Sequence, residues 1–180
     1  IPYSQTWQGK VESPGDNSAT AWVGYTDEGL WIRVDVLDDL IVSNIQPNDI
    51  RGHWRSDSVE ICVDPGDGSE HTLKTFKAGI FPFDASGQVR AARAADTSQG
   101  PIERSAPGMR LKSESIDGGY RIVTVIPWKH IGISPEPGTR LAFNILVYDG
   151  DKADAHPGEN IGQSRLAWSP RSGVQGRPED

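Results

Sequence analysis

The stretch Leu30–Asp39, "LWIRVDVLDD", alternates apolar and polar side chains along its length. Every second position is apolar (Leu30, Ile32, Val34 and Val36), and the positions between them carry Trp31, Arg33 and Asp35. Successive side chains of a β-strand point to opposite faces, so one face of this stretch is apolar and the other polar. The pattern predicts a strand that packs one face against a core.

The same period of two recurs along the chain. It is found in "ATAWVGY" (19–25), "SVEICVD" (58–64), "YRIVTVIPW" (120–128) and "RLAFNILVYD" (140–149). Turn-forming clusters lie between the strands, namely "TDEG" (26–29), "DPGDG" (64–68), "DASG" (84–87), "DGG" (117–119) and "SPEPGT" (134–139). The one helical candidate is a turn or two in "PWKHIG" after Pro127. The pattern predicts an all-β chain, an antiparallel β-sandwich of about eight to ten strands with a jelly-roll or immunoglobulin-like arrangement.

The length of 180 residues favours one domain, which we expect to span residues 1–180 with a polar tail over 170–180. The chain opens on Ile1-Pro2, so we expect it to be a processed or excised piece of a longer protein. The net charge of −7 argues against nucleic acid as a partner, because phosphate binding needs clustered cations. No apolar run reaches the roughly 18 residues that span a bilayer, so we expect no membrane association. The single cysteine, Cys62, lies among apolar residues and is expected to pack as a small hydrophobe.

Catalytic motifs are absent from the sequence. There is no G-x-S-x-G, H-E-x-x-H or C-x-x-C, and the P-loop and dinucleotide fingerprints are also missing. The four histidines, His53, His71, His130 and His156, never stand four residues apart and are expected to be solvated in loops. Glu60 and Asp64 share a strand face about 13 Å apart, too far for a glycosidase pair without a partner from another strand. The sequence therefore favours a non-catalytic domain, while an unrecognised enzyme remains open.

Six tryptophans are many for this length. Trp31, Trp128 and Trp168 adjoin strand patterns and are interpreted as packing residues. Trp54 differs, because it lies in the polar segment "RGHWRSD" before a strand. An exposed indole flanked by polar groups can stack on the apolar face of a sugar ring while its neighbours bind hydroxyls. The pattern alone leaves sugar binding and a structural role for Trp54 equally open.

Acidic side chains gather in three segments, 35–39, 64–68 and 148–154. Calcium takes six to eight hard oxygen ligands and often connects the loops of β-sandwiches. None of the segments has EF-hand spacing, so solvated turn acids are the alternative. The candidate calcium ligands are Asp38, Asp64, Asp67, Asp149 and Asp151.

Four segments together carry a resemblance to a known family. They are "WRSDSVEICVDPGDG" (54–68), "GGYRIVTVIPWKHIG" (118–132), "PGTRLAFNILVYDGD" (137–151) and "RLAWSP" (165–170). In order and approximate spacing, from about Ala19 to Pro170, the chain resembles family 9 carbohydrate-binding modules, whose sandwich is shared by DOMON-type haem domains. The resemblance implies a β-sandwich with structural calcium and a sugar site in which two tryptophans clamp a glucose or cellobiose unit.

The resemblance also implies candidate sugar-binding residues. Trp54 matches the first clamp, and Glu60, six residues on, matches the acceptor of sugar hydroxyls. Lys77 falls near a sugar-binding arginine of the family, and Asn144 matches the asparagine of its "FNI" strand. The second clamp would follow "WS", but residues 170–180 contain no aromatic side chain, and the final strand of the family has no counterpart. A different glycan, a site built on one tryptophan and a purely structural module are all compatible with this difference.

We therefore expect a non-catalytic carbohydrate-binding module that binds an oligo- or polysaccharide of the glucan or xylan type through Trp54 and Glu60. We expect it to be monomeric, secreted or periplasmic, and appended to a multidomain polysaccharide-degrading enzyme such as a glycoside hydrolase. Two alternatives remain. One is a haem-binding DOMON-type electron-transfer domain, which would need an axial ligand such as Met109, although a lone methionine more often packs in the core. The other is a structural sandwich that binds no ligand of its own.

Overall fold

The computed structural model describes residues 1–66, 75–94 and 98–169 of the chain. The strands are β1 (Thr6–Gln8), β2 (Asn17–Tyr25), β3 (Gly29–Asp38), β4 (Ser58–Asp64), β5 (Phe76–Phe81), β6 (Arg90–Arg93), β7 (Gly100–Pro101), β8 (Arg110–Ile116), β9 (Gly119–Pro127), β10 (Ala142–Asp149) and β11 (Ser164–Ala167). The helical elements are the 3₁₀ turns η1 (Tyr3–Gln5) and η2 (His53–Arg55) and the one-turn helices α1 (Ile102–Ser105) and α2 (Trp128–Ile131).

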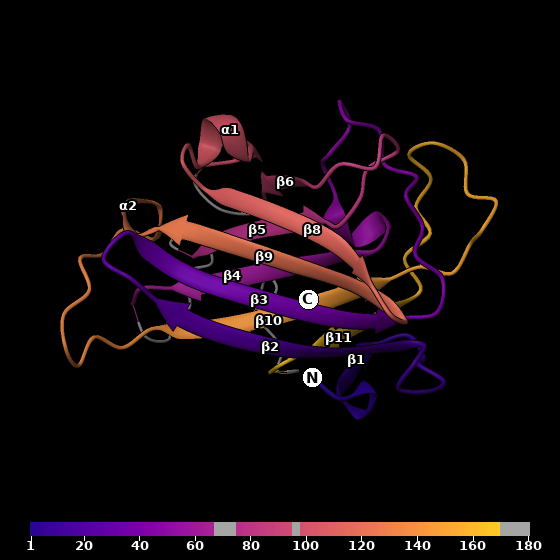
Figure 1. Ribbon diagram of the computed structural model, residues 1–180, viewed down its shortest axis with the longest axis horizontal. Coiled ribbons are helices and arrows are strands. Elements are labelled where there is room, and N and C mark those ends of the chain that lie inside the picture. Colours follow the sequence, from indigo (N-terminus) through magenta and orange to yellow (C-terminus); the bar gives the residue numbers. More distant parts are fainter. Residues whose placement is uncertain (67–74, 95–97, 170–180) are drawn as a thin grey trace.

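The strands form two antiparallel sheets packed face to face (Figure 1). The larger sheet has seven strands in the order β1-β11-β10-β4-β5-β6-β7, and the smaller has four in the order β2-β3-β9-β8. The predicted antiparallel β-sandwich is confirmed. The described residues hold eleven strands rather than eight to ten because β1 and β7, of three and two residues, are too short to show an alternating pattern.

The hydrophobic core lies between the two sheets. On β3 the apolar side chains of Leu30, Ile32, Val34 and Val36 are buried, as the alternation predicts. They pack with Val59, Ile61 and Val63 of β4 and with Ile145 and Val147 of β10 in one continuous cluster. Each sheet therefore contributes every second residue of its central strands, the arrangement expected of aligned sandwiches.

The outer face of the seven-stranded sheet is covered as well. All residues of β4 from Ser58 to Asp64 are buried, so the prediction of a strand with only one buried face is incomplete. Two long loops, residues 39–52 and 150–163, lie side by side at one end of the sandwich (Figure 1). The amide of Asn44 donates to the carbonyl of Glu159 over 2.9 Å, and the N–H of Ile161 donates to the carbonyl of Arg55 over 2.7 Å. The first bond joins the two loops, and the second joins the loop 150–163 to η2.

Two small apolar clusters lie on that outer face. One contains Ile45, Ile50, Phe81 and Ala92. The other contains Cys62, Leu146, Tyr148 and Ala167, with Trp7 packed against it. The thiol of Cys62 is buried in this second cluster and burial raises its pKa, so the prediction of a packing role is confirmed.

Several local predictions can be compared with the structure. The turn after Pro127 is confirmed as α2, which ends at Gly132 in the left-handed conformation. Trp128 is buried and donates to the carbonyl of Thr26 over 2.8 Å, but Trp168 is 55% exposed, so its assignment as a packing residue is wrong. No helix in the described part of the chain is long and apolar enough to cross a membrane. The predicted tail over 170–180 lies outside the described residues.

Candidate functional site

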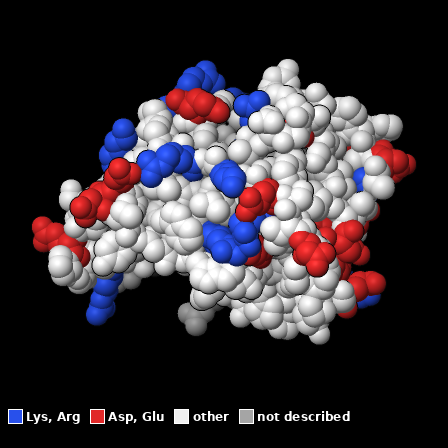
Figure 2. Space-filling view, viewed as in Figure 1, with Lys and Arg blue, Asp and Glu red and all other residues white. Residues whose placement is uncertain are grey.

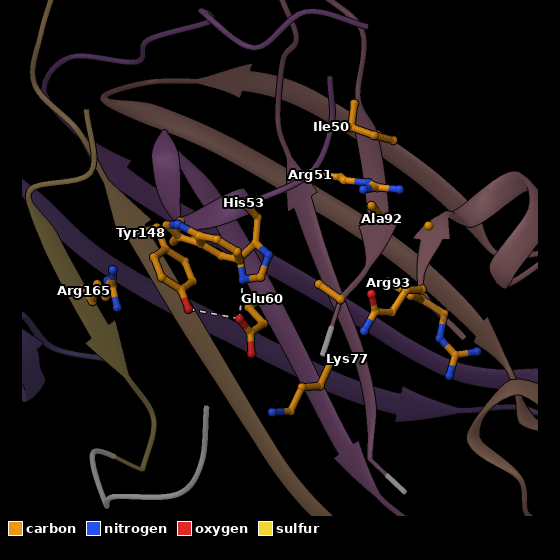
Figure 3. Close-up of a pocket in the computed structure, with 14 residues that line it drawn as sticks. Ile50, Arg51, His53, Glu60, Lys77, Ala92, Arg93, Tyr148 and Arg165 are labelled. Carbon is orange, nitrogen blue, oxygen red and sulfur yellow. Dashed lines mark hydrogen bonds and ion pairs between the residues drawn. The ribbon is translucent and has the colours of Figure 1, made fainter. Parts of the chain in front are cut away.

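A cavity of about 480 Å³ opens on the outer face of the seven-stranded sheet, between the two small clusters (Figure 3). Its described lining is Ile50, Arg51, Gly52, His53, Trp54, Glu60, Lys77, Ala92, Arg93, Ala94, Gln99, Gly100, Tyr148 and Arg165. The floor consists of outward positions of neighbouring strands. The rim comes from the segment that enters η2, from β11, and from Ala94, Gln99 and Gly100.

Strand register brings the floor residues together. Glu60 of β4 pairs with Leu146 of β10 on one side and with Gly79 of β5 on the other. Residues two positions away on a strand share a face, so Tyr148 and Lys77 lie on the same face as Glu60. Three candidate residues, Trp54, Glu60 and Lys77, therefore converge on one cavity although 23 positions separate the first from the last.

Glu60 is the centre of the floor. Its Oε2 accepts hydrogen bonds from Nε2 of His53 and, over 3.0 Å, from the hydroxyl of Tyr148. Its Oε1 accepts a bond from Sγ of Cys62 over 3.0 Å. Burial alone raises the pKa of Glu60, but the charge and hydrogen bond of His53 and the nearby Lys77 lower it to about 2. At neutral pH the floor therefore presents a carboxylate, and only a weak thiol donor occupies Oε1.

His53 lies beneath the mouth of the cavity, and the prediction that its side chain is solvated is wrong. It is 5% exposed, with its ring edge-to-face against Trp54 at 5.4 Å and against Tyr148 at 5.0 Å. The ring fits because Gly79 lies under it, where a Cβ would come within 2.1 Å of Cγ of His53. The sequence offered one signal for this role, the position of His53 directly before Trp54. His156 is exposed as predicted, His130 is half-buried, and His71 lies outside the described residues.

Trp54 forms part of the rim, with 43% of its surface exposed. Gly52 precedes η2 with a φ of +73°, a conformation that favours glycine, and turns the chain so that the indole stands beside the cavity. Arg55 fixes the segment from below. Its guanidinium donates to the carbonyls of Gly52, Arg51, Asp49 and Gly158 and pairs with the carboxylate of Asp49 at 3.0 Å. Sequence reasoning missed this role of Arg55.

Two other sequence candidates lie away from the cavity. Asn144 is buried on β10, where its amide donates to the carbonyl of Ser169 and accepts from the same residue's N–H over 3.0 Å. This exchange holds the chain after β11, and Asn144 is not among the lining residues. Met109 packs in the core between the sheets, which confirms the packing interpretation that competed with a haem-ligand role.

A second cluster, of carboxylates, lies where the ends of the two sheets meet. Asp38 at the end of β3 and Asp149 at the end of β10 come together with Asp57, and Asp151 and Asp39 adjoin Asp38. In each such trio one oxygen per residue lies within 4.8 Å of the others. Sequence reasoning found Asp38, Asp149 and Asp151 but missed Asp16, Asp39 and Asp57. Asp64 lies at the other end of β4, paired with Ala142, and Asp67 lies outside the described residues.

The electrostatics of the carboxylate cluster are unusual. Burial, together with the charge of neighbouring carboxylates, raises the pKa of Asp38 to about 6 and that of Asp149 to about 8. Both oxygens of Asp57 accept backbone N–H groups, from Val42 at 2.6 Å and Gly150 at 2.9 Å. Oδ1 of Asp149, by contrast, is buried without a hydrogen-bond partner among the described residues, as is Oδ1 of Asn17. The cluster has more carboxylate oxygens than hydrogen-bond donors to satisfy them. No cationic side chain of the described residues is paired with it.

The family model described as "Carbohydrate family 9 binding domain-like" matches residues 1–175. Endo-1,4-beta-xylanase A of Thermotoga neapolitana is 30% identical over 156 residues, which cover 86% of this chain and 13% of that enzyme. The chain thus spans about an eighth of the length of the curated relative that it matches.

Two solved structures of a family 9 carbohydrate-binding module from Caldicellulosiruptor kristjanssonii share the fold. The complex with cellotriose has a TM-score of 0.59 at 15% sequence identity and covers 90% of this chain and 71% of that one. The complex with glucose has a TM-score of 0.57 at 17% identity, covering 84% and 66%. At such identities the likeness concerns the fold alone.

Proposed function

The chain belongs to the family 9 carbohydrate-binding domains, and from that premise we propose that the cavity on its outer sheet face holds a sugar residue, without catalysing its cleavage. One observation carries the proposal. A half-exposed indole, a buried carboxylate and a lysine from three separate elements, namely Trp54, Glu60 and Lys77, line the same cavity of about 480 Å³.

Each group has a role in the proposal. The face of Trp54 packs against the C–H face of a pyranose ring, while Oε1 of Glu60 accepts a sugar hydroxyl. Lys77 donates to a ring or hydroxyl oxygen from the opposite side. His53 and Tyr148 act through Glu60, because their hydrogen bonds keep its carboxylate ionised and fixed in one orientation. Asn144, which is engaged with Ser169, has no part in this site.

The wider setting is also proposed. Because the chain matches only 13% of the xylanase relative, we place it as a module of a larger secreted or periplasmic polysaccharide-degrading enzyme. The module would be monomeric and would hold that enzyme near a glucan or xylan, which raises the local substrate concentration. A single stacking platform predicts weak affinity, since one ring face and a few hydrogen bonds offset only part of the ordering cost.

We further propose a structural calcium ion in the carboxylate cluster. The donor set fits, because Asp38, Asp149 and Asp151 are hard oxygen ligands and Oδ1 of Asp149 is buried without a partner. Calcium there would join the end of β3 in one sheet to the end of β10 in the other. At 100 times its Kd the ion would stabilise the fold by about 2.7 kcal/mol.

Isothermal titration calorimetry tests the sugar site. Glucose, cellobiose, xylobiose, soluble glucan and xylan are titrated into the wild type, Trp54→Ala and a matched control, Trp22→Ala. The exposed fraction of Trp22 is 44%, similar to the 43% of Trp54, but Trp22 lies on β2 of the other sheet. Binding that survives in Trp22→Ala and disappears in Trp54→Ala supports the site. Absence of heat with every sugar from a cooperatively folded wild type would instead support the purely structural alternative.

Calcium is tested separately by thermal unfolding in EDTA and in calcium. The expected result is a higher Tm in calcium for the wild type and no calcium response for Asp149→Asn. Asp64→Asn serves as the control, since Asp64 lies apart from the cluster and should leave the calcium response intact. An unchanged wild-type Tm on adding calcium would contradict the ion.

A further inference from the structure

Two guanidinium groups at the cavity have no carboxylate partner among the described residues. Arg51 stands on the rim before η2, and Arg165 projects from β11 on the other side of Tyr148 and Glu60 (Figure 3). Five other arginines are paired with carboxylates: Arg33 and Arg121 with Asp35, Arg55 with Asp49, Arg90 with Asp84 and Arg110 with Glu28. On the face of the four-stranded sheet, blue and red side chains accordingly adjoin one another (Figure 2).

Arg165 is held in place by rings rather than by an acid. Its guanidinium carbon lies 5.2 Å from the ring centre of Tyr148 and 5.7 Å from that of Trp7. A guanidinium that contacts aromatic rings through its face keeps its N–H groups in its own plane, available to a planar anion. The packing therefore positions Arg165 without consuming its hydrogen-bonding edge.

The charge of the cavity is opposite to that of the protein. The whole chain carries a net charge of −7, yet the described lining contains Arg51, Lys77, Arg93 and Arg165 against the single carboxylate of Glu60. Arg93 is directed elsewhere, since it donates to the carbonyl of Ser105 at 3.0 Å and lies over the ring of Phe76. Glu60 is already bonded to His53. The described lining therefore carries more cationic than anionic side chains, and Arg51 and Arg165 have no carboxylate partner among the described residues.

We propose that the sugar in this cavity is an acidic one, a hexuronate whose C6 carboxylate is bound by Arg165 with Arg51 as a second cationic contact. The inference rests on the proposed function, because it names the class of sugar for the same site. A hexuronate has the pyranose ring that Trp54 can stack on and the hydroxyls that Glu60 can accept. Its carboxylate matches the forked N–H edge of arginine, with which it forms short charge-assisted bonds. A neutral hexose offers the guanidinium groups only a hydroxymethyl group.

The test compares two ligands that differ only at C6, methyl β-D-glucuronide and methyl β-D-glucoside, by calorimetric titration into the whole chain. The glucuronide is expected to bind at least tenfold more tightly in 20 mM salt. The preference should shrink several-fold in 500 mM salt, because part of it comes from attraction between charges at a partly exposed site. Equal affinities for the two glycosides would overturn the inference and leave the sugar site standing. Binding of neither glycoside would overturn the inference, and the titrations with cellobiose, xylobiose and the soluble polymers decide the proposed function separately.

Variants assign the preference to residues. Arg165→Gln should bring the two affinities within about threefold of each other, and Arg51→Gln should have a smaller effect because its side chain is more exposed. Arg140→Gln is the control, since Arg140 is exposed in the loop before β10 and does not line the cavity. A full preference retained in both Arg165→Gln and Arg51→Gln would overturn the assignment. If Arg165→Gln unfolds, the salt dependence of the wild type still decides whether the preference for the glucuronide is electrostatic.

Discussion

The imidazole of His53 lies directly on Gly79, so closely that a Cβ at position 79 would meet Cγ of His53 at 2.1 Å. This contact allows a side chain from η2 to reach the carboxylate of Glu60 on β4 across the face of β5. The absence of a side chain at position 79 is therefore part of what shapes the proposed sugar site.

Gly79→Ala should displace His53 and weaken the site. We expect a loss of about 1–3 kcal/mol in unfolding free energy, the usual cost of forcing atoms into a packed region, and a sugar affinity reduced at least tenfold. Gly24→Ala is the matched control, because a Cβ there would make only an ordinary 3.8 Å contact with Trp31. Urea unfolding and calorimetry measure the two effects. A wild-type affinity in Gly79→Ala would contradict the role given to the contact.

Tyr148→Phe removes one donor from the buried carboxylate of Glu60 and leaves the aromatic ring in place. The expected cost is about 1–3 kcal/mol in unfolding free energy, because the hydroxyl donates to a charged acceptor that water cannot readily replace. Tyr25→Phe, at a ring 79% exposed, should change the stability by less than about 0.5 kcal/mol. Equal stabilities of the two variants would show that the bond to Glu60 contributes nothing.

Arg55→Lys should loosen the segment that carries Trp54. A lysine keeps the charge but cannot reproduce the fork that reaches Asp49, Gly52 and Gly158 together. We expect sugar affinity to fall about tenfold and stability by about 1–3 kcal/mol. Arg110→Lys is the control, since its pair with Glu28 is largely exposed and worth under about 1 kcal/mol. An Arg55→Lys protein that matches this control would refute the positioning role.

The carboxylate cluster predicts opposite pH responses with and without calcium. In EDTA, Asp38 and Asp149 have pKa values of about 6 and about 8, above the usual value for aspartate in an unfolded chain. The folded state then binds more protons than the unfolded state between about pH 4 and pH 8, so stability rises as the pH falls through that range.

With saturating calcium the same carboxylates are held ionised, so the rise in stability on acidification should disappear or reverse as protons compete with the ion. Thermal unfolding at pH 5, 6, 7 and 8 in EDTA and in calcium measures this difference. Parallel pH profiles in the two conditions would count against calcium at these residues.

The sequence predicted the sheets well because burial between them follows a period of two. On β3 the alternation of Leu30, Ile32, Val34 and Val36 is unambiguous. It could not show the second buried face of β4, because that face is covered by residues distant in sequence. Tyr148 of β10 bonds Glu60, and Leu146 and Ala167 pack with Cys62. Trp168 was misassigned for a related reason, since an aromatic residue beside a strand pattern does not reveal which face is covered.

Within the site, Trp54, Glu60 and Lys77 could be named from a resemblance, and the structure brings them to one cavity. His53, Tyr148 and Arg165 could not, because their places depend on strand register and on the space left by Gly79. The carboxylate cluster shows the same limit. Asp38 and Asp149 were visible in acidic runs, whereas Asp57 is a single acid before β4 that meets them only in the folded chain.

The last two residues of β10 belong to different centres: Tyr148 bonds Glu60 at the cavity, and Asp149 belongs to the carboxylate cluster. If calcium fixes the end of this strand, occupancy of either centre must favour the other by an equal factor, since thermodynamic linkage is reciprocal. The protein would then hold its glycan most firmly where free calcium is abundant. Chelation would act as a release signal, and a polymer-bound molecule would bind its ion more tightly than one in free solution.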